Sequence, residues 1–380
     1  MQEKENYLTD QLITYIGNKR SLLDFISVAV DFVKSETGKE KLHCLDVFSG
    51  SGIVSRFLKA HAESLTVNDL ELYSRIINSC YLANQSEINS GELKAFYEKI
   101  RTRTEQLLKS SEKSGFIHEL YAPEETENVR PGERCFYTAY NARYIDFMRR
   151  AIETEVPENL RHFFIAPLLS QASVHANTAG IFKGFYKNSK TGVGQFGGNA
   201  RNALSRICSD IVLPFPVFSN FECPVRIFQN EANELSEMPE LYAALPEKEF
   251  DLVYMDPPYN QHPYGSNYFM LNLIASYERP DSERISRVSG IPKGWNRSAY
   301  NKKRVASETF EKLISNIRSK FIVISFNNEG FISREEMETL LSRHGKVRVF
   351  ESNYNAFRGS RNLRNRDIHV SEYLFVLDKR

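Results

Sequence analysis

The chain has 380 residues, of which 41% are hydrophobic and 26% charged, with a formal net charge of +1, as in a globular protein of one large or two moderate domains. No apolar run approaches the roughly 20 residues of a membrane helix and the first ten residues do not resemble a secretory signal, so we expect a cytoplasmic protein without membrane association. The five cysteines form no Cys-x-x-Cys pair, so we predict neither a metal site nor a disulfide framework.

The first notable segment, residues 14–21, is polar and turn-like and precedes a predicted helix over residues 22–33. Tyr15 and Lys19 flank Gly17, where the backbone could approach a ligand. Taken alone, this pattern is more often a plain loop before a helix.

A buried strand is predicted over residues 42–48, followed at once by a glycine turn and a helix over residues 53–60. This order is typical of nucleotide-cofactor sites, because glycines let the backbone come close to a bound group. The turn, Phe48-x-Gly50-x-Gly52, is shorter than the dinucleotide fingerprint and lacks its third glycine. It therefore favours a compact adenosyl ligand over a pyrophosphate.

The second predicted strand, residues 64–67, ends in Asn68-Asp69. An acid at this strand end typically hydrogen-bonds ribose hydroxyls, and Asp69 has the spacing of about 20 residues from the glycine turn that this role requires. The alternative is a surface acid that closes a strand.

The strand and helix alternation is lost over residues 86–224. Between residues 177 and 206, aromatic, basic, asparagine and glycine residues gather in predicted loops, and these residue types contact phosphates and bases. We interpret residues 86–224 as an inserted, largely helical recognition domain, and residues 1–85 and 225–380 as the catalytic domain. An ordinary helical insertion is the alternative.

The central predicted strand, residues 251–255, stops at Asp256-Pro257-Pro258-Tyr259. The prolines cannot donate hydrogen bonds, Asp256 adds a carboxylate where open α/β sheets bind ligands, and Tyr259 adds an aromatic face. Two acceptors, a stacking surface and no nucleophile suit a planar ring with an exocyclic NH2 group. The alternative is a simple turn.

Two basic segments follow. Residues 279–304 contain eight Lys or Arg against two acids, and four arginines lie between residues 358 and 366. Either could meet phosphates or be a solvated surface. Strands are predicted over residues 224–228, 321–326, 346–350 and 372–377, with helices over 267–277, 310–318 and 335–341.

The four motifs, Tyr15-x-Gly17-x-Lys19, Phe48-x-Gly50-x-Gly52, Asn68-Asp69 and Asp256-Pro257-Pro258-Tyr259, occur in this order. The sequence resembles the Dam-like, alpha-group N6-adenine DNA methyltransferases over its first ~80 residues and most of the chain after residue 225. The resemblance implies a Rossmann-like methyltransferase sheet and S-adenosylmethionine as methyl donor.

By motif position, the resemblance places Tyr15, Lys19, Phe48, Gly50, Gly52, Asp69 and Asp256 at the cofactor, and Asp256, Pro257 and Tyr259 at a flipped adenine. It implies double-stranded DNA as substrate and a restriction-modification role, and we expect a monomer. The long insertion leaves the recognition sequence open.

Three alternatives remain open. An RNA adenine-N6 methyltransferase can use the same loop, and a non-catalytic nucleic-acid-binding protein can keep the same fold. Cytosine-N4 methylation offers the same amino geometry, whereas cytosine-C5 methylation would need a cysteine nucleophile that this loop lacks.

Overall fold

The centre of the molecule is a seven-stranded sheet with the order β3-β2-β1-β4-β5-β7-β6. The computed structural model describes residues 2–198, 203–258, 261, 263–327, 330–355 and 369–380. The strands are β1 (Leu42–Asp46), β2 (Ala62–Asn68), β3 (Val225–Phe228), β4 (Phe250–Met255), β5 (Ser319–Asn327), β6 (Lys346–Asn355) and β7 (His369–Asp378). All pairs are parallel except those of β7, which runs antiparallel to both β5 and β6.

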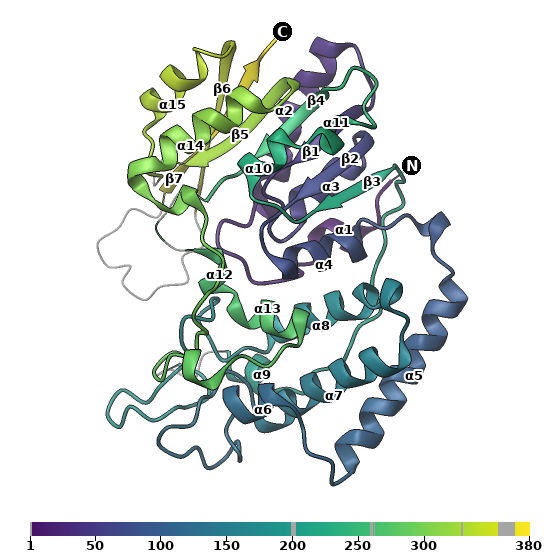
Figure 1. Cartoon of the computed structure of the whole chain (residues 1–380), viewed down its shortest axis with the longest axis vertical. Coiled ribbons are helices and arrows are strands. Elements are labelled where there is room, and N and C mark those ends of the chain that lie inside the picture. Colours follow the sequence, from purple (N-terminus) through teal and green to yellow (C-terminus); the bar gives the residue numbers. More distant parts are fainter. Residues whose placement is uncertain (1, 199–202, 259–260, 262, 328–329, 356–368) are drawn as a thin grey trace.

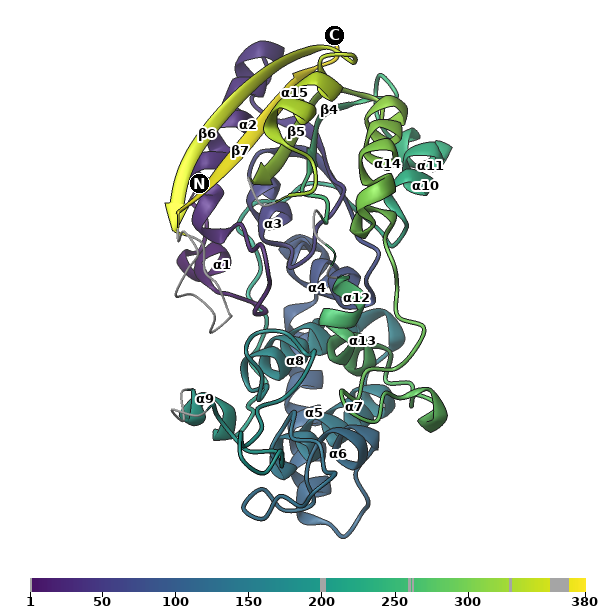
Figure 2. The ribbon, with the colours of Figure 1, turned by 90° about the vertical axis from the view of Figure 1, so that its left-hand side faces the viewer.

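Helices cover both faces of this sheet (Figure 2). Because side chains alternate along a strand, Leu252 and Tyr254 of β4 pack with helices α2 (Leu23–Thr37) and α3 (Ile53–Lys59). Val253 and Met255 instead pack on the opposite side. The helices there are α10 (Ala232–Glu237), α11 (Pro239–Tyr242), α14 (Lys303–Asn316) and α15 (Arg334–Leu341). All six residues of β4 are buried, as expected for a central strand.

A helical lobe lies beside the sheet (Figure 1). Its core is one apolar cluster that includes side chains of α4, α5, α6, α7, α8 and α13. The bounds of these helices are α4 (Leu72–Tyr81), α5 (Ser90–Lys109), α6 (Phe116–Tyr121), α7 (Ala139–Glu155), α8 (His162–Val174) and α13 (Phe269–Ser276). Elsewhere in the chain there are three short helices, α1 (Glu5–Thr9), α9 (Leu204–Cys208) and α12 (Tyr264–Asn267). Helix α13 follows β4 in the sequence, so the chain re-enters this lobe directly after the Asp-Pro-Pro motif.

The strand order reverses between β1 and β4. The chain runs outward from β1 through β2 to β3 and then returns to place β4 on the other side of β1. In such sheets the connections at the carboxyl ends diverge at this point and leave a crevice where ligands bind. The glycine turn after β1 and Asp256 after β4 therefore lie at the edge of the sheet that favours binding.

The predicted α/β class, with a mostly parallel sheet and a largely helical insertion, is confirmed. Each of the seven predicted strands is present. The last two are longer than predicted and form a ten-pair antiparallel ladder between β6 and β7.

Candidate active site

The ends of β1 and β4 lie side by side. Asp46 pairs with Tyr254 in the register of the two strands, and the Val47 N–H donates to the Tyr254 carbonyl at 3.1 Å. Residues Asp256, Pro257 and Pro258 continue from β4 without regular structure, which follows from the absence of an N–H on proline. The pairing brings the carboxylate of Asp256 next to the turn that follows β1.

That turn requires its glycines. Gly50 and Gly52 have φ angles of +52° and +76°, in the left-handed region that favours glycine. A Cβ on Gly50 would lie 2.8 Å from the ring of Tyr15, and one on Gly52 would lie 2.7 Å from Oδ1 of Asn78. The turn therefore packs against the Tyr15 ring with no space for a side chain.

Asp69, at the end of β2, fixes the same turn. Its Oδ2 accepts the Gly50 N–H at 2.7 Å, and its Oδ1 accepts the Glu71 N–H at 2.8 Å. Burial raises the pKa of Asp69 to about 6, although both backbone hydrogen bonds oppose the shift. The carboxylate thus joins the glycine turn to the start of α4.

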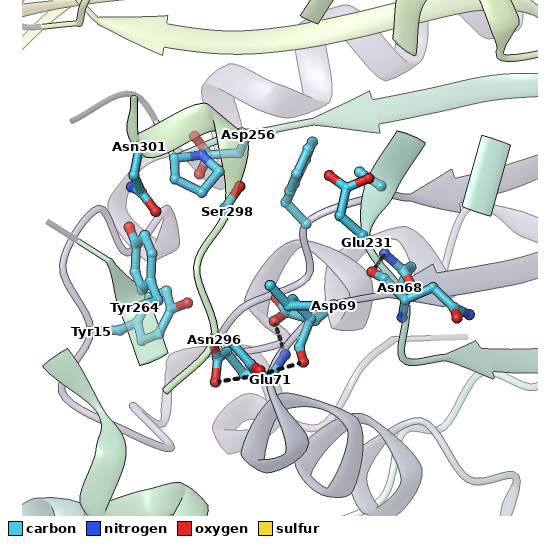
Figure 3. A pocket seen from close by; sticks show the side chains of 15 residues that line it. Tyr15, Asn68, Asp69, Glu71, Glu231, Asp256, Tyr264, Asn296, Ser298 and Asn301 are labelled. Carbon is cyan, nitrogen blue, oxygen red and sulfur yellow. Dashed lines mark hydrogen bonds between the residues drawn. The ribbon is translucent and has the colours of Figure 1, made fainter. Parts of the chain in front are cut away.

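These strand ends surround one open pocket, seen in Figure 3. Tyr15 and Tyr264 lie on one side of it, Asn68 and Glu231 lie on the other, and Asp256 lies between them at one end. The described lining residues are Tyr15, Phe48, Asn68, Asp69, Leu70, Glu71, Asn230, Glu231, Ala232, Asp256, Pro258, Tyr264, Asn296, Ser298 and Asn301. They include four carboxylic acids and no Lys or Arg, so the pocket favours a cationic ligand.

An aromatic stack forms one wall. The ring of Tyr15 lies 5.0 Å from that of Tyr264 and 4.9 Å from that of Tyr268, both in stacked orientation. The Tyr268 hydroxyl accepts the Ile16 N–H at 2.8 Å. The N-terminal loop is therefore held against α12 and α13, which places the Tyr15 ring at the pocket.

The helical lobe and the basic segment meet the pocket at Glu71, whose side chain is buried. Asn272 of α13 donates to Glu71 Oε2 at 2.5 Å, and Asn296 donates to the same oxygen at 3.4 Å. Burial raises the pKa of Glu71 to about 7. Residues of the helical lobe and of the basic segment 279–304 thus converge on one side of the pocket.

Asp256 is the polar group best placed to act on a ligand. Its Oδ2 lies 3.2 Å from Nζ of Lys19, whereas its Oδ1 is shielded from water and has no hydrogen-bond partner in the part of the chain that the structure describes. The pKa of Asp256 is raised to about 6, chiefly by burial; Lys19 lowers this pKa and Glu372 adds a smaller upward effect, and both are included in that value. An unpaired buried acceptor is costly, so this oxygen fits the hydrogen of a ligand.

Comparison with known proteins identifies the family. The sequence profile of the D12 class of N6 adenine-specific DNA methyltransferases matches residues 15–207 and 226–340, more than half of the chain. The chain belongs to this family. It is 29% identical to the Type II methyltransferase M.NlaIII of Neisseria lactamica over 97% of this chain and 99% of that protein. It is 28% identical to the Type II methyltransferase M.CviAII of Paramecium bursaria Chlorella virus 1, over 96% of this chain and 98% of that protein.

The match extends to larger proteins. The Type II methyltransferase M.FokI of Planomicrobium okeanokoites is 27% identical over 96% of this chain, which covers 52% of that protein. The present methyltransferase therefore corresponds in length to the smaller relatives and to about half of M.FokI.

The structure brings most of the predicted site residues of this methyltransferase together. Tyr15, Phe48, Asp69 and Asp256 line the pocket, and Gly50 and Gly52 form the turn behind it. Lys19 is buried and does not appear among the described lining residues, but contacts Asp256 instead. Pro257 lines a small apolar cavity that it shares with Pro258. Tyr259 and the four arginines between residues 358 and 366 lie outside the described residues.

Several residues at the site were not anticipated from the sequence. Glu71, Tyr264, Asn296, Ser298 and Asn301 line the pocket, and Glu372 contacts Lys19 behind Asp256. For Asn296, Ser298 and Asn301 a signal existed, because they fall within the basic segment predicted to lie near the active strand. For Glu372 the only signal was an acid at the first position of the predicted strand over residues 372–377, which is otherwise apolar.

Within the described ranges, no helix is long and apolar enough to cross a membrane. The same residues contain no group of three or more His, Cys, Asp or Glu side chains that could hold a metal ion.

Asp46 links the stability of the methyltransferase to pH. It is fully buried at the end of β1, accepts a 2.5 Å hydrogen bond from Ser55 of α3, and burial raises its pKa to about 7. A carboxyl group with a raised folded-state pKa stabilises the fold at low pH, and this stabilisation is lost as the pH rises through about 7. We therefore expect Asp46→Asn to raise the melting temperature relative to wild type more at pH 8 than at pH 5. Thermal denaturation at both pH values tests this, and an offset independent of pH would contradict it.

Proposed function

We propose that this protein is the modification enzyme of a restriction-modification system, and that it transfers a methyl group from S-adenosylmethionine to N6 of a specific adenine in double-stranded DNA. Its relatives of similar length, M.NlaIII and M.CviAII, are type II methyltransferases, which supports the modification role. The observation that carries the chemical assignment is the free Oδ1 of Asp256 beside the pocket. Since the proposed substrate is cellular DNA, we expect the enzyme to act in the cytoplasm. We also expect it to be a monomer.

The residues present fit S-adenosylmethionine. The glycine turn admits no Cβ and lets backbone groups approach a ligand closely. The acidic lining of Asp69, Glu71, Glu231 and Asp256 complements a cationic sulfonium and ammonium. We assign Tyr15, Phe48, Asp69 and Asp256 to contacts with the cofactor, Gly50 and Gly52 to its cradle, and Lys19 to an indirect role through Asp256.

For the reaction, a bound sulfonium supplies an electrophilic methyl carbon and becomes a neutral thioether when its carbon–sulfur bond breaks. The protein positions the nucleophile. We propose that Asp256 Oδ1 and the carbonyl of Pro257 accept the two N6 hydrogens, which directs the nitrogen lone pair out of the ring plane. One N6 proton leaves after the new carbon–nitrogen bond forms, and Asp256 can accept it. Orientation and electrostatic stabilisation supply the rate advantage.

We further propose that residues 86–224 recognise the target sequence and that residues 1–85 and 225–380 carry catalysis. The helical lobe supports this division because most of its helices fall within residues 86–224 and because it lies beside the sheet (Figure 1). The basic segment 279–304 contacts both the helical lobe and the pocket. Arg279 forms an ion pair with Glu119 of α6, Tyr121 donates to the Gly290 carbonyl, and Asn296 lines the pocket.

All eight Lys and Arg side chains of this segment are exposed. Arg279 pairs with Glu119, and the other seven are therefore available for DNA phosphates. The adenine must leave the helix stack to reach Asp256, at a cost of a few kcal/mol, and we propose that Tyr259 stacks on the extruded base.

A methyl-transfer assay tests this function. We expect the purified protein with radiolabelled S-adenosylmethionine to label unmethylated duplex DNA, and nucleoside analysis to show N6-methyladenine. Long-read sequencing of the methylated DNA would give the recognition sequence. Label in ribosomal RNA but not in duplex DNA, or N4-methylcytosine as the product, would contradict the proposal. Failure to bind S-adenosylmethionine in calorimetry would favour a non-catalytic binding protein.

A further inference from the structure

Lys19 contacts two carboxylates from different strands, of which Glu372 is fully buried and Asp256 is partly exposed at the pocket. Its Nζ lies 3.2 Å from Oδ2 of Asp256 and 3.1 Å from Oε1 of Glu372. The side-chain exposures are 4% for Lys19, 19% for Asp256 and 0% for Glu372, so water contributes little screening to this cluster. Three segments far apart in the sequence, the loop before α2, the end of β4 and β7, supply the three charges.

Glu372 is an unusual residue for its place in the sheet. Leu374 and Val376 follow it at two-residue spacing on the same strand and are buried in the cluster under α2 and α3. An aliphatic side chain would satisfy that alternation, whereas a buried carboxylate has to be paired to be tolerated. Here Ser325 of β5 donates to Glu372 Oε1 at 2.6 Å, and that oxygen also meets Lys19. Ser325 thus holds Glu372 against the ammonium, and Glu372 is not among the described residues that line the pocket.

We propose that Glu372 is a positioning residue for methyl transfer: by sharing the Lys19 ammonium, it keeps that ammonium on one oxygen of Asp256 and leaves the other oxygen available to the adenine amino group. Without Glu372, one of the contacts that restrain the ammonium is lost, and the ammonium can shift toward the second oxygen of Asp256. The free acceptor would then be engaged, and its capacity to accept an N6 hydrogen would fall.

The charges around Asp256 set the sign of the expected effect. Lys19 lowers the pKa of Asp256 and Glu372 raises it. Asp46 of β1 and the Tyr254 hydroxyl of β4 also interact electrostatically with Asp256. Removing the charge of Glu372 is therefore expected to lower the pKa of Asp256.

The inference rests on the proposed methyl-transfer activity, and its test is the variant Glu372→Gln. We expect kcat on duplex DNA to fall by roughly ten- to hundredfold, because misplacement of a catalytic group by about 1 Å can cost that much, while KM for DNA stays close to wild type. We also expect the acid limb of the pH profile to move to lower pH. A loss of kcat with an unmoved acid limb would indicate a merely structural role and would overturn the proposal, as would wild-type behaviour.

Glu351→Gln is the matched control. Glu351 lies on β6, in the hairpin with β7, and its partner is the exposed Arg334. We expect that variant to keep the wild-type kcat and pH profile. If the wild-type protein itself methylates no nucleic acid, the proposed function fails. If it is active and Glu372→Gln matches Glu351→Gln, only the present inference fails.

Two further measurements cover the cases in which Glu372→Gln cannot be assayed. If it does not fold, Ser325→Ala leaves every charge in place but releases Glu372, and we expect a several-fold lower kcat with the acid limb displaced in the same direction. If it folds but is inactive, the carboxyl ¹³C resonance of Asp256, identified by its absence from Asp256→Asn, can be titrated in the ligand-free protein. An unchanged kcat in the first case or an unchanged titration in the second would overturn the proposal.

Discussion

Replacing Asp256 by asparagine should abolish most methyl transfer without unfolding the protein. Asparagine keeps the size of the side chain, but it replaces one carboxylate oxygen with an NH2 group that cannot accept a hydrogen bond. In one orientation the asparagine places its NH2 group where the free acceptor was. In the other it places a neutral oxygen there, which accepts a hydrogen bond without the negative charge. General-base and hydrogen-bonding groups of this kind contribute roughly 10²–10⁴-fold to rate. We therefore expect the rate constant of methyl transfer, measured in a single-turnover assay, to fall by about that factor.

The same residue should control the response of the enzyme to pH. Only the ionised form of Asp256 leaves both oxygens as acceptors, and burial raises its pKa to about 6. Activity of the wild-type enzyme should therefore rise with pH through about 6, well above the value for an exposed aspartate. An acid limb near pH 4 would mean that the group in control is a solvated carboxyl and not Asp256.

Asp251 provides the control for this substitution. It lies at the opposite end of the same strand, where its carboxylate accepts hydrogen bonds from Lys39 and from the His43 N–H. Asp251→Asn should lower the melting temperature and leave the activity per folded molecule unchanged. Asp256→Asn should lower the activity per folded molecule and leave the melting temperature close to that of the wild type. Equal losses of activity in both variants would show that damage to β4, and not loss of the acceptor, explains the effect.

The sheet was predictable because its information is local. The central strands β1, β4 and β5 contain short apolar runs, and the glycine turn and the Asp-Pro-Pro motif mark the ends of β1 and β4 directly in the sequence. Since the carboxyl ends of parallel strands share one edge of a sheet, motifs that follow β1, β2 and β4 are expected at the same edge, and Gly50, Asp69 and Asp256 lie there.

The position of Lys19 was not predictable in this way. It depends on β7 running antiparallel between β5 and β6, which brings Glu372 to the base of the site from near the end of the chain. Likewise, Glu71 meets Asn272 only because α13 packs into the helical lobe after β4. These contacts join residues about 200 or more positions apart, and no pattern within a single segment specifies them.

The second large effect should come from Gly50→Ala, which tests the cofactor side of the pocket. An alanine at φ +52° costs about 1–2 kcal/mol, and its Cβ would approach the Tyr15 ring to 2.8 Å, closer than real contacts allow. The Tyr15 ring must then shift within its stack with Tyr264 and Tyr268, or the turn must move and disturb its 2.7 Å hydrogen bond to Asp69. The first movement displaces Tyr15 and the second disturbs Asp69, and both residues line the pocket. We therefore expect the affinity for S-adenosylmethionine to fall at least about tenfold, equivalent to 1.4 kcal/mol or more.

Gly184→Ala is the matched control for this substitution. Gly184 does not have a positive φ angle, and a Cβ there would meet no atom within 4 Å. Calorimetric titration of both variants with S-adenosylmethionine should therefore give near wild-type affinity for Gly184→Ala and weak or undetectable binding for Gly50→Ala. Wild-type affinity in Gly50→Ala would mean that the cofactor does not depend on this turn, and the pocket between β1 and β4 would then have to hold a different ligand.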